Sequence, residues 1–416
     1  MHSKVIPNLA NSGKSTSLLS YDHLSFGFKS TTHDRSIYSA TFEGTKILLL
    51  CQVDDFAVAC PNEDLAKGLC AQIGKALQLP SEDTLPFKCL GLIKDFNGLD
   101  VAQHSDAIKL TCEKYIDCVL TTHGWSKPSP PVPSKPSAPL PVDAVTSLYA
   151  YQGPPENTAE HAALVAKYGF AYRTLLGKLL YACVACRPDI GYATITLSKF
   201  STCSYDHHFA MLKKVAKYLR ATKDWGIIYR QSQTDTSLPP SNFIRSTMDA
   251  ELPDFPTVNT QEPVAFLDAA HANDLRNRRS TTGYAFLLCS GAISYRCKTQ
   301  STTATSSTEA KFLAAVATAK HARYMRAIMT NLGFPPKGPT VMCCDNQSSI
   351  NVINARVPTE LSRHIDIQHF AIQDWKESGA IVMEFISGVI NPSDDLTKPL
   401  GWVLHDRHAR RIMGHC

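Results

Sequence analysis

The sequence has no run of about 18 consecutive apolar residues, so no membrane-spanning helix is predicted. Its first residues, Met1 to Ser15, are polar and lack the apolar core of a secretory signal peptide. We therefore expect an intracellular protein, cytoplasmic or nuclear, with no membrane partner. The 14 cysteines are then expected to be reduced thiols rather than disulfides.

A strong charge of one sign and a metal-binding cysteine pattern are also lacking. The net charge of +5 permits a polyanionic partner without requiring one. Cys183 and Cys186 form one C-x-x-C motif, with no second pair at zinc-ligand spacing. Because they lie in an apolar helical stretch, we expect buried packing thiols rather than a metal or redox site.

The composition is that of a globular protein, with 44% hydrophobic and 19% charged residues over 416 positions, enough for two or three domains. Seven prolines between Pro128 and Pro141 predict an extended linker. We expect a flexible N-terminus (1–35), a first domain (36–125), a Pro-rich linker (126–160), a helical region (161–230), a second linker (231–263) and a last domain (264–416).

In the first domain, two apolar runs around a pair of acids predict a hairpin, Ile47–Cys51 and Phe56–Cys60, with its carboxylates at the turn. A helix is predicted next, then two strands, then another helix. These four elements are expected at Asn62–Gln78, Phe87–Ile93, Leu99–Gln103 and Cys112–Leu120.

The last domain alternates between strand and helix patterns. Strands are predicted at Val264–Asp268, Gly283–Leu288, Ala292–Arg296, Thr340–Cys344 and Ile381–Ile386. Helical segments are predicted at Ser306–Leu332, Gln347–Asn354, Ile365–Ser378 and Asn391–Thr397. This order predicts an α/β fold, in which a mixed sheet is flanked by helices.

Four acids lie at the ends of these elements: Asp268, Glu309, Asp345 and Asp394. Element ends are where polar groups leave the core, so the four could share one pocket. Carboxylates that converge repel one another unless cations neutralise them, and hard oxygen ligands suit Mg²⁺ or Mn²⁺. From position alone, ordinary surface carboxylates remain the alternative.

The motifs around these acids occur in a specific order over about 140 residues. They are Ser280–Tyr284 (STTGY), Ser306–Ala310 (SSTEA), Asp345–Gln347 (DNQ), Arg363–Asp366 (RHID) and Asp394–Leu400 (DDLTKPL). Together they closely resemble the RNase H domain at the end of copia-type retrotransposon polyproteins.

The resemblance implies that two Mg²⁺ or Mn²⁺ ions are held by Asp268, Glu309, Asp345 and Asp394, and that the domain cuts the RNA strand of an RNA–DNA hybrid. Asp394 is preferred to Asp395 because of its distance from the Thr-Lys-Pro-Leu motif. Two roles are open for His364: it could contact phosphate near the site, or it could fix a loop through hydrogen bonds.

The resemblance extends upstream to about residue 36. Gln52–Asp55 stands where such a reverse transcriptase has its Tyr-Val-Asp-Asp hairpin, so Asp54 and Asp55 resemble the metal-binding pair of the polymerase palm. Phe87–Leu92, Cys186–Asp189 and Lys217–Arg220 follow in the family's order. Residues 161–229 resemble its connecting region. The basic residues of one helix there could contact a nucleic-acid backbone or simply be solvated: Lys213, Lys214, Lys217 and Arg220.

Two parts of the family pattern are missing from the sequence. No earlier strand carries the third polymerase aspartate, and the fingers are absent, so we expect no independent polymerase activity. The leading hypothesis is an active RNase H joined to a truncated polymerase. The alternatives are a decayed fragment that at most binds nucleic acid, and an unrelated metal-dependent phosphatase or exonuclease. The oligomeric state is left open.

Overall fold

A computed structural model of the protein describes residues 2–6, 27–52, 55–77, 89–126, 137–231, 253–254, 261–355 and 366–415. These residues cluster into two compact units. Unit 1 contains Met1–Gln103 and Arg323–Lys337, and unit 2 contains His104–Ala322 and Gly338–Cys416. None of the described helices has the length and apolar character needed to cross a membrane.

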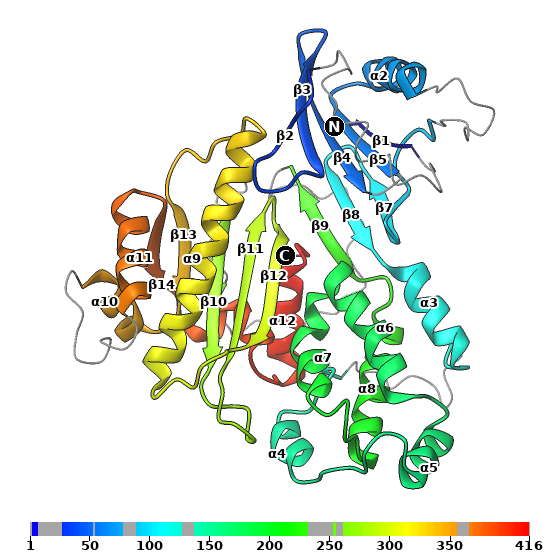
Figure 1. Ribbon diagram of the computed structural model, residues 1–416, viewed down its shortest axis with the longest axis vertical. Coiled ribbons are helices and arrows are strands. Elements are labelled where there is room, and N and C mark those ends of the chain that lie inside the picture. The colour runs from blue at the N-terminus through cyan, green and yellow to red at the C-terminus, as the bar shows by residue number, and fades with distance from the viewer. Residues whose placement is uncertain are drawn as a thin grey trace. The chain divides into compact units, whose positions relative to one another are not determined.

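Unit 1 is built on an antiparallel five-stranded sheet in the order β1-β5-β4-β3-β2, with helix α2 packed beside it (Figure 1). A short hairpin, β6 and β7, follows. The elements are β1 (His2–Ile6), β2 (Lys29–Ser30), β3 (Ile37–Phe42), β4 (Thr45–Gln52), β5 (Asp55–Cys60), α2 (Glu63–Leu77), β6 (Asp95–Phe96) and β7 (Leu99–Gln103). Its core consists of alternate apolar side chains of β4 and β5 together with one face of α2.

Unit 2 begins with a strand, a group of helices and a second strand that pairs with the first. These elements are β8 (Ala107–Thr111), α3 (Glu113–Thr122), α4 (Ala144–Tyr149), α5 (Ala159–Tyr168), α6 (Tyr172–Ala185), η1 (Pro188–Ile190), α7 (Gly191–Ser198), α8 (Asp206–Ala221) and β9 (Gly226–Arg230). Cys183 and Cys186 are buried free thiols here, and burial raises the pKa of Cys183 to about 12. Both features agree with the predicted packing role.

The rest of unit 2 is a mixed sheet in the order β12-β11-β10-β13-β14. The first three strands are antiparallel neighbours, whereas β13 runs parallel to both β10 and β14. The strands are β10 (Val264–Ala270), β11 (Thr281–Leu288), β12 (Gly291–Thr299), β13 (Thr340–Cys344) and β14 (Ile381–Phe385). The helical elements are α9 (Ser307–Asn331), of which only the part up to Ala322 belongs to unit 2, α10 (Gln347–Asn354), α11 (Asp366–Glu377), η4 (Gly388–Ile390), η5 (Pro392–Leu396) and α12 (Trp402–Ile412). The predicted α/β class is confirmed.

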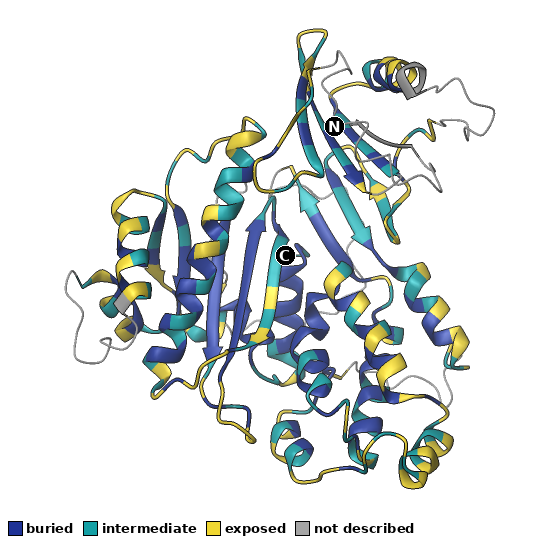
Figure 2. Ribbon diagram, viewed as in Figure 1, coloured by how far each residue is buried: buried dark blue, intermediate teal, exposed yellow. Residues whose placement is uncertain are grey.

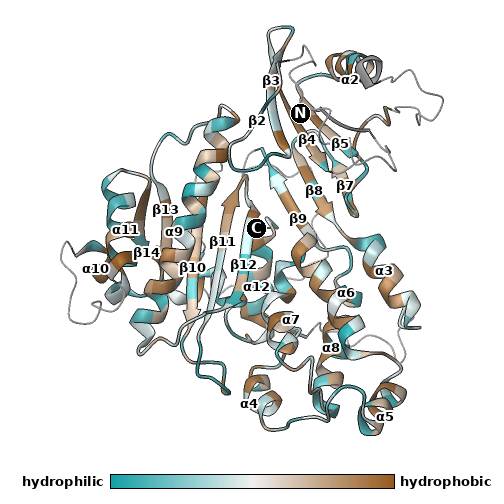
Figure 3. Ribbon diagram, in the orientation of Figure 1, coloured by the Kyte–Doolittle hydropathy of each residue, from teal (hydrophilic) through white to brown (hydrophobic). Residues whose placement is uncertain are grey.

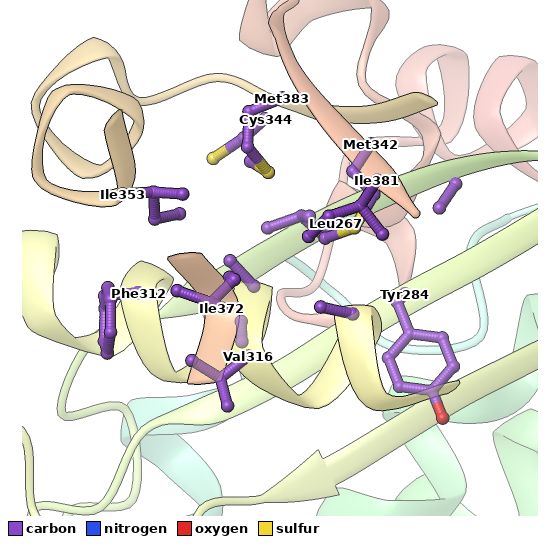
Figure 4. Packing of buried hydrophobic residues seen from close by; sticks show 14 of the residues in the cluster. Leu267, Tyr284, Phe312, Val316, Met342, Cys344, Ile353, Ile372, Ile381 and Met383 are labelled. Atoms are coloured by element: carbon purple, nitrogen blue, oxygen red, sulfur yellow. The ribbon is translucent and has the colours of Figure 1, made fainter. Parts of the chain in front are cut away.

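Both faces of this mixed sheet are covered, which leaves β10 and β11 buried along most of their length (Figure 2). Successive side chains of a strand point to opposite faces. Ala265 and Leu267 therefore pack against α9, α10 and α11 (Figure 4), while Val264 and Phe266 pack on the side of η5 and α12. By the same alternation Asp268 shares the face of Phe266. In Figure 3 the hydrophobic residues of β11 are coloured brown.

Strand β9 is hydrogen-bonded to two parts of the mixed-sheet segment, the turn between β11 and β12 and the residues that follow α12. The amide of Ile228 donates to the Met413 carbonyl (2.8 Å), and the amide of Arg230 donates to the Cys289 carbonyl (2.7 Å). Gly414 has a positive φ of 73°, and a Cβ there would lie 2.1 Å from the Ile228 carbonyl oxygen. The close approach of these backbones requires glycine. The helical region and the mixed sheet thus form one compact unit.

Most predicted elements agree with the structure, but several details differ. The strand expected over Phe87–Ile93 is not formed in its described part, 89–93, which holds only an isolated bridge. Strands β3 and β8 were not predicted, because their short sequences mix polar and apolar residues without a clear strand pattern. Each is a strand because it pairs with another strand, β3 with β4 and β8 with β9. Helix α4 lies inside the segment expected to be a linker.

Candidate metal centre

The register of two parallel strands brings the first two acids together. Leu267 of β10 is paired with Cys344 of β13, so the next residues, Asp268 and Asp345, emerge at the same end of neighbouring strands. Asp268 is almost completely buried, and Asp345 is partly exposed. The hydrogen-bond ladder of the sheet therefore sets the spacing of these two carboxylates.

Asp394 reaches the same place on the short helix η5. Its preceding cap, Asn391, accepts a hydrogen bond from the amide of Ser393 (3.2 Å) and donates to the carbonyl of Leu267 (3.0 Å). This bond ties η5 to the strand that carries Asp268. Gly283 lies opposite Asp268 in β11, and a Cβ at Gly283 would come within 2.8 Å of Leu396 Cβ. The glycine of the STTGY motif thus allows η5 to pack directly on the sheet.

Asp268, Asp345 and Asp394 together form an acidic cluster in which each residue offers an oxygen within 4.8 Å of the other two. Two lysines contact it. Lys311 Nζ contacts Asp345 Oδ1 and lies 3.0 Å from Asp268 Oδ1. Lys398 Nζ lies 2.9 Å from Asp394 Oδ2 and 3.7 Å from Asp268 Oδ2. Three carboxyl groups therefore face two ammonium groups.

The pKa values follow from this imbalance. Burial and the neighbouring Asp268 raise the pKa of the Asp394 carboxyl group to about 7, against the effect of Lys398. Burial also acts to raise the pKa of Asp268, but Lys398 and Lys311 hold it below its ordinary value. Near neutral pH, Asp394 is thus divided between its acid and its carboxylate, which is expected of like charges that lack a further cation.

The donor chemistry of the acidic cluster fits a hard divalent cation. All its ligand atoms are carboxylate oxygens, which Mg²⁺ and Mn²⁺ prefer. Asp394 Oδ1 is buried and has no hydrogen-bond partner among the described residues. Asp268 Oδ2, by contrast, is oriented by the Thr397 hydroxyl, which donates to it at 2.5 Å. One oxygen is held in place and another is free to coordinate.

Glu309, the fourth predicted ligand, is not in the acidic cluster. Its Oε2 accepts hydrogen bonds from the amide (2.7 Å) and the hydroxyl (2.6 Å) of Thr305 at the start of α9. Lys311 follows two positions later, and residues two apart on a helix do not share a face. In this structure the first turn of α9 presents the lysine, not the glutamate, to Asp268 and Asp345.

Asp395, the neighbour of Asp394, belongs to a different site. Its Oδ1 lies 2.6 Å from Nδ1 of His405, whose Nε2 lies 3.0 Å from the Tyr218 hydroxyl. Tyr218 donates to Asp189 (2.7 Å), which is paired with the fully buried Arg187 (2.6 Å). Burial acts to lower the pKa of His405, but Asp395 raises it. The geometry therefore assigns Asp394 to the acidic cluster and Asp395 to a buried polar network.

The remaining predicted residues are Asp54, Asp55, His364 and the basic residues of one helix. Asp54 and His364 lie outside the described residues, so their predicted roles stay predictions. Asp55 begins β5, where it is paired with Gln52 and half-buried.

The basic helix face is that of α8, and its residues differ in exposure. Lys213 Nζ lies 5.3 Å from the centre of the Trp125 ring, and Arg220 donates to the Trp125 carbonyl (3.2 Å). Burial lowers the pKa of Lys214, whereas Lys217 is exposed. Two of the four candidates therefore pack on Trp125, and nucleic-acid contact by any of them stays a prediction.

Sequence reasoning missed the residues that hold the acidic cluster in place. Thr397 and Lys398 lie in the Thr-Lys-Pro-Leu motif, which was used only to locate Asp394, and Asn391 was named only as the start of the last predicted helical segment. Lys311 stands two residues after Glu309. A basic residue beside predicted metal ligands is a signal that could have been noticed in the sequence.

Comparison with known proteins finds transposon polyproteins that are similar to the chain. It is 27% identical over 373 residues to the retrovirus-related Pol polyprotein from transposon TNT 1-94 of Nicotiana tabacum, covering 88% of this chain and 24% of that protein. It is 25% identical over 390 residues to the corresponding polyprotein from transposon RE2 of Arabidopsis thaliana, covering 94% of this chain and 23% of that protein. The chain thus spans about a quarter of the length of these relatives.

Among solved structures, LC11-RNase H1 isolated from compost is similar with a TM-score of 0.27 and 10% identity, over 33% of this chain and 93% of that one. A similarity this weak does not by itself establish a shared fold. No protein-family model matches the chain. Over nearly its whole length the chain is thus similar to retrovirus-related Pol polyproteins from plant transposons, in agreement with the predicted resemblance to copia-type polyproteins.

Proposed function

We propose that unit 2 is a metal-dependent RNase H that hydrolyses the RNA strand of RNA–DNA hybrids. The observation that carries the proposal is the convergence of Asp268, Asp345 and Asp394 within 4.8 Å. They come from two parallel strands and a short helix of a chain whose relatives are Pol polyproteins. When bound, a pair of Mg²⁺ or Mn²⁺ ions would supply Lewis-acid stabilisation of the charge that develops on a phosphodiester.

The protein's own residues prepare the site for such ions. The hydroxyl of Thr397 fixes one oxygen of Asp268, and the bond from Asn391 holds η5 at the end of β10. Asp394, with a pKa of about 7, would lose its proton when a cation binds between the carboxylates. A site with two ions further needs the carboxylate of Glu309, which would have to exchange its hydrogen bonds to Thr305 for a metal.

Choice of substrate would rest on duplex shape rather than base sequence. A hybrid duplex presents 2′-hydroxyl groups of one strand in a wide, shallow minor groove, where a protein can distinguish RNA from DNA. Phosphate contacts would be supplied by exposed basic residues, among which Lys398 is 40% exposed at the acidic cluster. The proposed partner is therefore an RNA–DNA hybrid of any sequence.

The test is cleavage of a hybrid whose RNA strand is labelled, with the purified full chain and Mg²⁺ or Mn²⁺. Cleavage of RNA in the hybrid, but not in an RNA–RNA duplex, is expected. Asp345→Asn should abolish it, because the amide is a poorer metal ligand than the carboxylate. Asp374→Asn, at an exposed position of α11, is the matched control and should cleave like the parent.

A second candidate function is nucleic-acid binding without catalysis. It is favoured by the contacts of Lys311 with two of the three acids and by the engagement of Glu309 with Thr305. A hybrid that is bound but stays intact with both Mg²⁺ and Mn²⁺ would support this reading and refute the nuclease.

A further inference from the structure

Lys311 occupies the space between two of the proposed metal ligands. Its ammonium group lies 3.0 Å from Asp268 Oδ1 and also contacts Asp345 Oδ1. The side chain is only 13% exposed, so it is held within the acidic cluster rather than extended into solvent. An ion shared by Asp268 and Asp345 would have to lie close to both of these oxygens, where Nζ now lies.

The two carboxylates are therefore neutralised from within the chain. At about 4 Å, unit charges in a partly buried protein site interact strongly, and a divalent ion would be repelled by the ammonium at such a distance. The ammonium group of Lys311 and a divalent ion therefore cannot occupy the space between Asp268 and Asp345 at the same time. Lys398 differs, because it contacts Asp394 and the other oxygen of Asp268 from a more exposed position.

We infer that Lys311 is a built-in competitor of the divalent cation, which must leave Asp268 and Asp345 before metal can bind there. This inference deepens the proposed function, because it rests on the same metal site. In the metal-free protein, Lys311 positions the two carboxylates and stabilises the fold. When metal is present, Lys311 lowers the affinity of the site for the cation.

The variant Lys311→Gln removes the charge and keeps most of the side chain. Mn²⁺ binding to the full chain is measured by electron paramagnetic resonance of the free ion. The binding that Asp345→Asn abolishes, seen as an increase in the free-ion signal, is assigned to the site. Lys311→Gln should bind Mn²⁺ at least about tenfold more tightly than the parent, since the competing charge is gone. Lys311→Arg, which keeps the charge, should bind weakly like the parent.

Thermal unfolding gives a second readout that does not depend on activity. Without metal, Lys311→Gln should unfold at a lower temperature than the parent, because Asp268 and Asp345 lose their counter-charge. With saturating Mn²⁺ its unfolding temperature should rise by more than that of the parent. Lys320→Gln, at an exposed position of the same helix, is the matched control and should change neither readout.

The outcomes separate this inference from the proposed function. Equal or weaker Mn²⁺ binding by Lys311→Gln, with binding by the parent intact, overturns the competitor role alone. Tighter binding by Lys311→Gln in a chain that never cleaves a hybrid supports the competitor role and refutes the nuclease. Absence of binding to the parent and to every Lys311 variant overturns both.

Discussion

The buried pair of Arg187 and Asp189 should be worth several kcal/mol to the stability of unit 2. Arg187 is fully buried and donates to both oxygens of Asp189, at 2.9 and 2.6 Å. It also donates to the carbonyl (2.8 Å) and the hydroxyl (2.6 Å) of Thr222. Arg187→Met leaves the Asp189 carboxylate buried without its counter-charge, and breaking a buried pair in this way costs about 3–5 kcal/mol.

Removal of both partners should cost less than the two single changes combined. Asp189→Leu alone strands a buried guanidinium and removes the acceptor of the Tyr218 hydroxyl. In the double variant no uncompensated charge remains, although Thr222 and Tyr218 still lose hydrogen bonds. We expect a coupling energy of about 3 kcal/mol between the two sites, at the upper end for contacting residues.

Urea unfolding followed by tryptophan fluorescence measures these energies for unit 2, because all four tryptophans lie in it: Trp125, Trp225, Trp375 and Trp402. Single variants that each cost under about 1 kcal/mol, or costs that simply add, would refute a strong buried pair.

The same pair predicts a pH dependence. Burial acts to raise the pKa of Asp189, but Arg187 and Tyr218 hold it below the ordinary value. An acid with a lowered folded-state pKa contributes stability above its unfolded pKa and loses it as the pH falls through the folded value. The stability gap between the parent and Asp189→Leu should therefore be constant near neutral pH and should narrow only in acid.

Two further predictions concern the acidic cluster. Because Asp394 has a pKa of about 7, Mn²⁺ affinity should rise up to about tenfold per pH unit below pH 7 and level off above it, with proton release seen by calorimetry in buffers of different ionisation enthalpy. An affinity that does not change between pH 5 and 8 would contradict the shifted pKa of Asp394, and Asp394→Asn should remove the proton release. Gly283→Ala should weaken Mn²⁺ binding and cost about 1–3 kcal/mol, since its Cβ would come 2.6 Å from Thr397 Cγ2 and push η5 off the sheet. Gly177→Ala, whose Cβ meets nothing within 4 Å, is the control, and equal metal affinity in both variants would refute the close-packing argument.

The sequence predicts the mixed sheet well because its signals are local. Period-two and helical patterns mark the elements of residues 264–397 to within a few positions, and Thr340–Cys344 and Gln347–Asn354 agree with β13 and α10 at both ends. Strand β8 has no such signal. It pairs with β9, more than a hundred residues later, and only that pairing makes it a strand.

The candidate site is predictable to a similar extent. The motifs single out Asp268, Asp345 and Asp394, and the register of β10 and β13 and the bond from Asn391 bring these three acids together. The side chains of Glu309 and Lys311 could not be assigned in the same way. Which of them faces the other acids depends on rotamers and on competition for hydrogen bonds with Thr305, and no spacing rule encodes this.

The adjacency of Asp394 and Asp395 has a consequence for how the proposed nuclease activity could be lost. One residue faces the acidic cluster, while the next is anchored through His405 and Tyr218 to the helical region upstream. A mutation in that upstream region can therefore displace Asp394 while every acid of the cluster stays intact. The three acids alone are then an incomplete sign of the proposed activity in a related sequence, and the presence of Arg187 and Asp189 is informative in its own right.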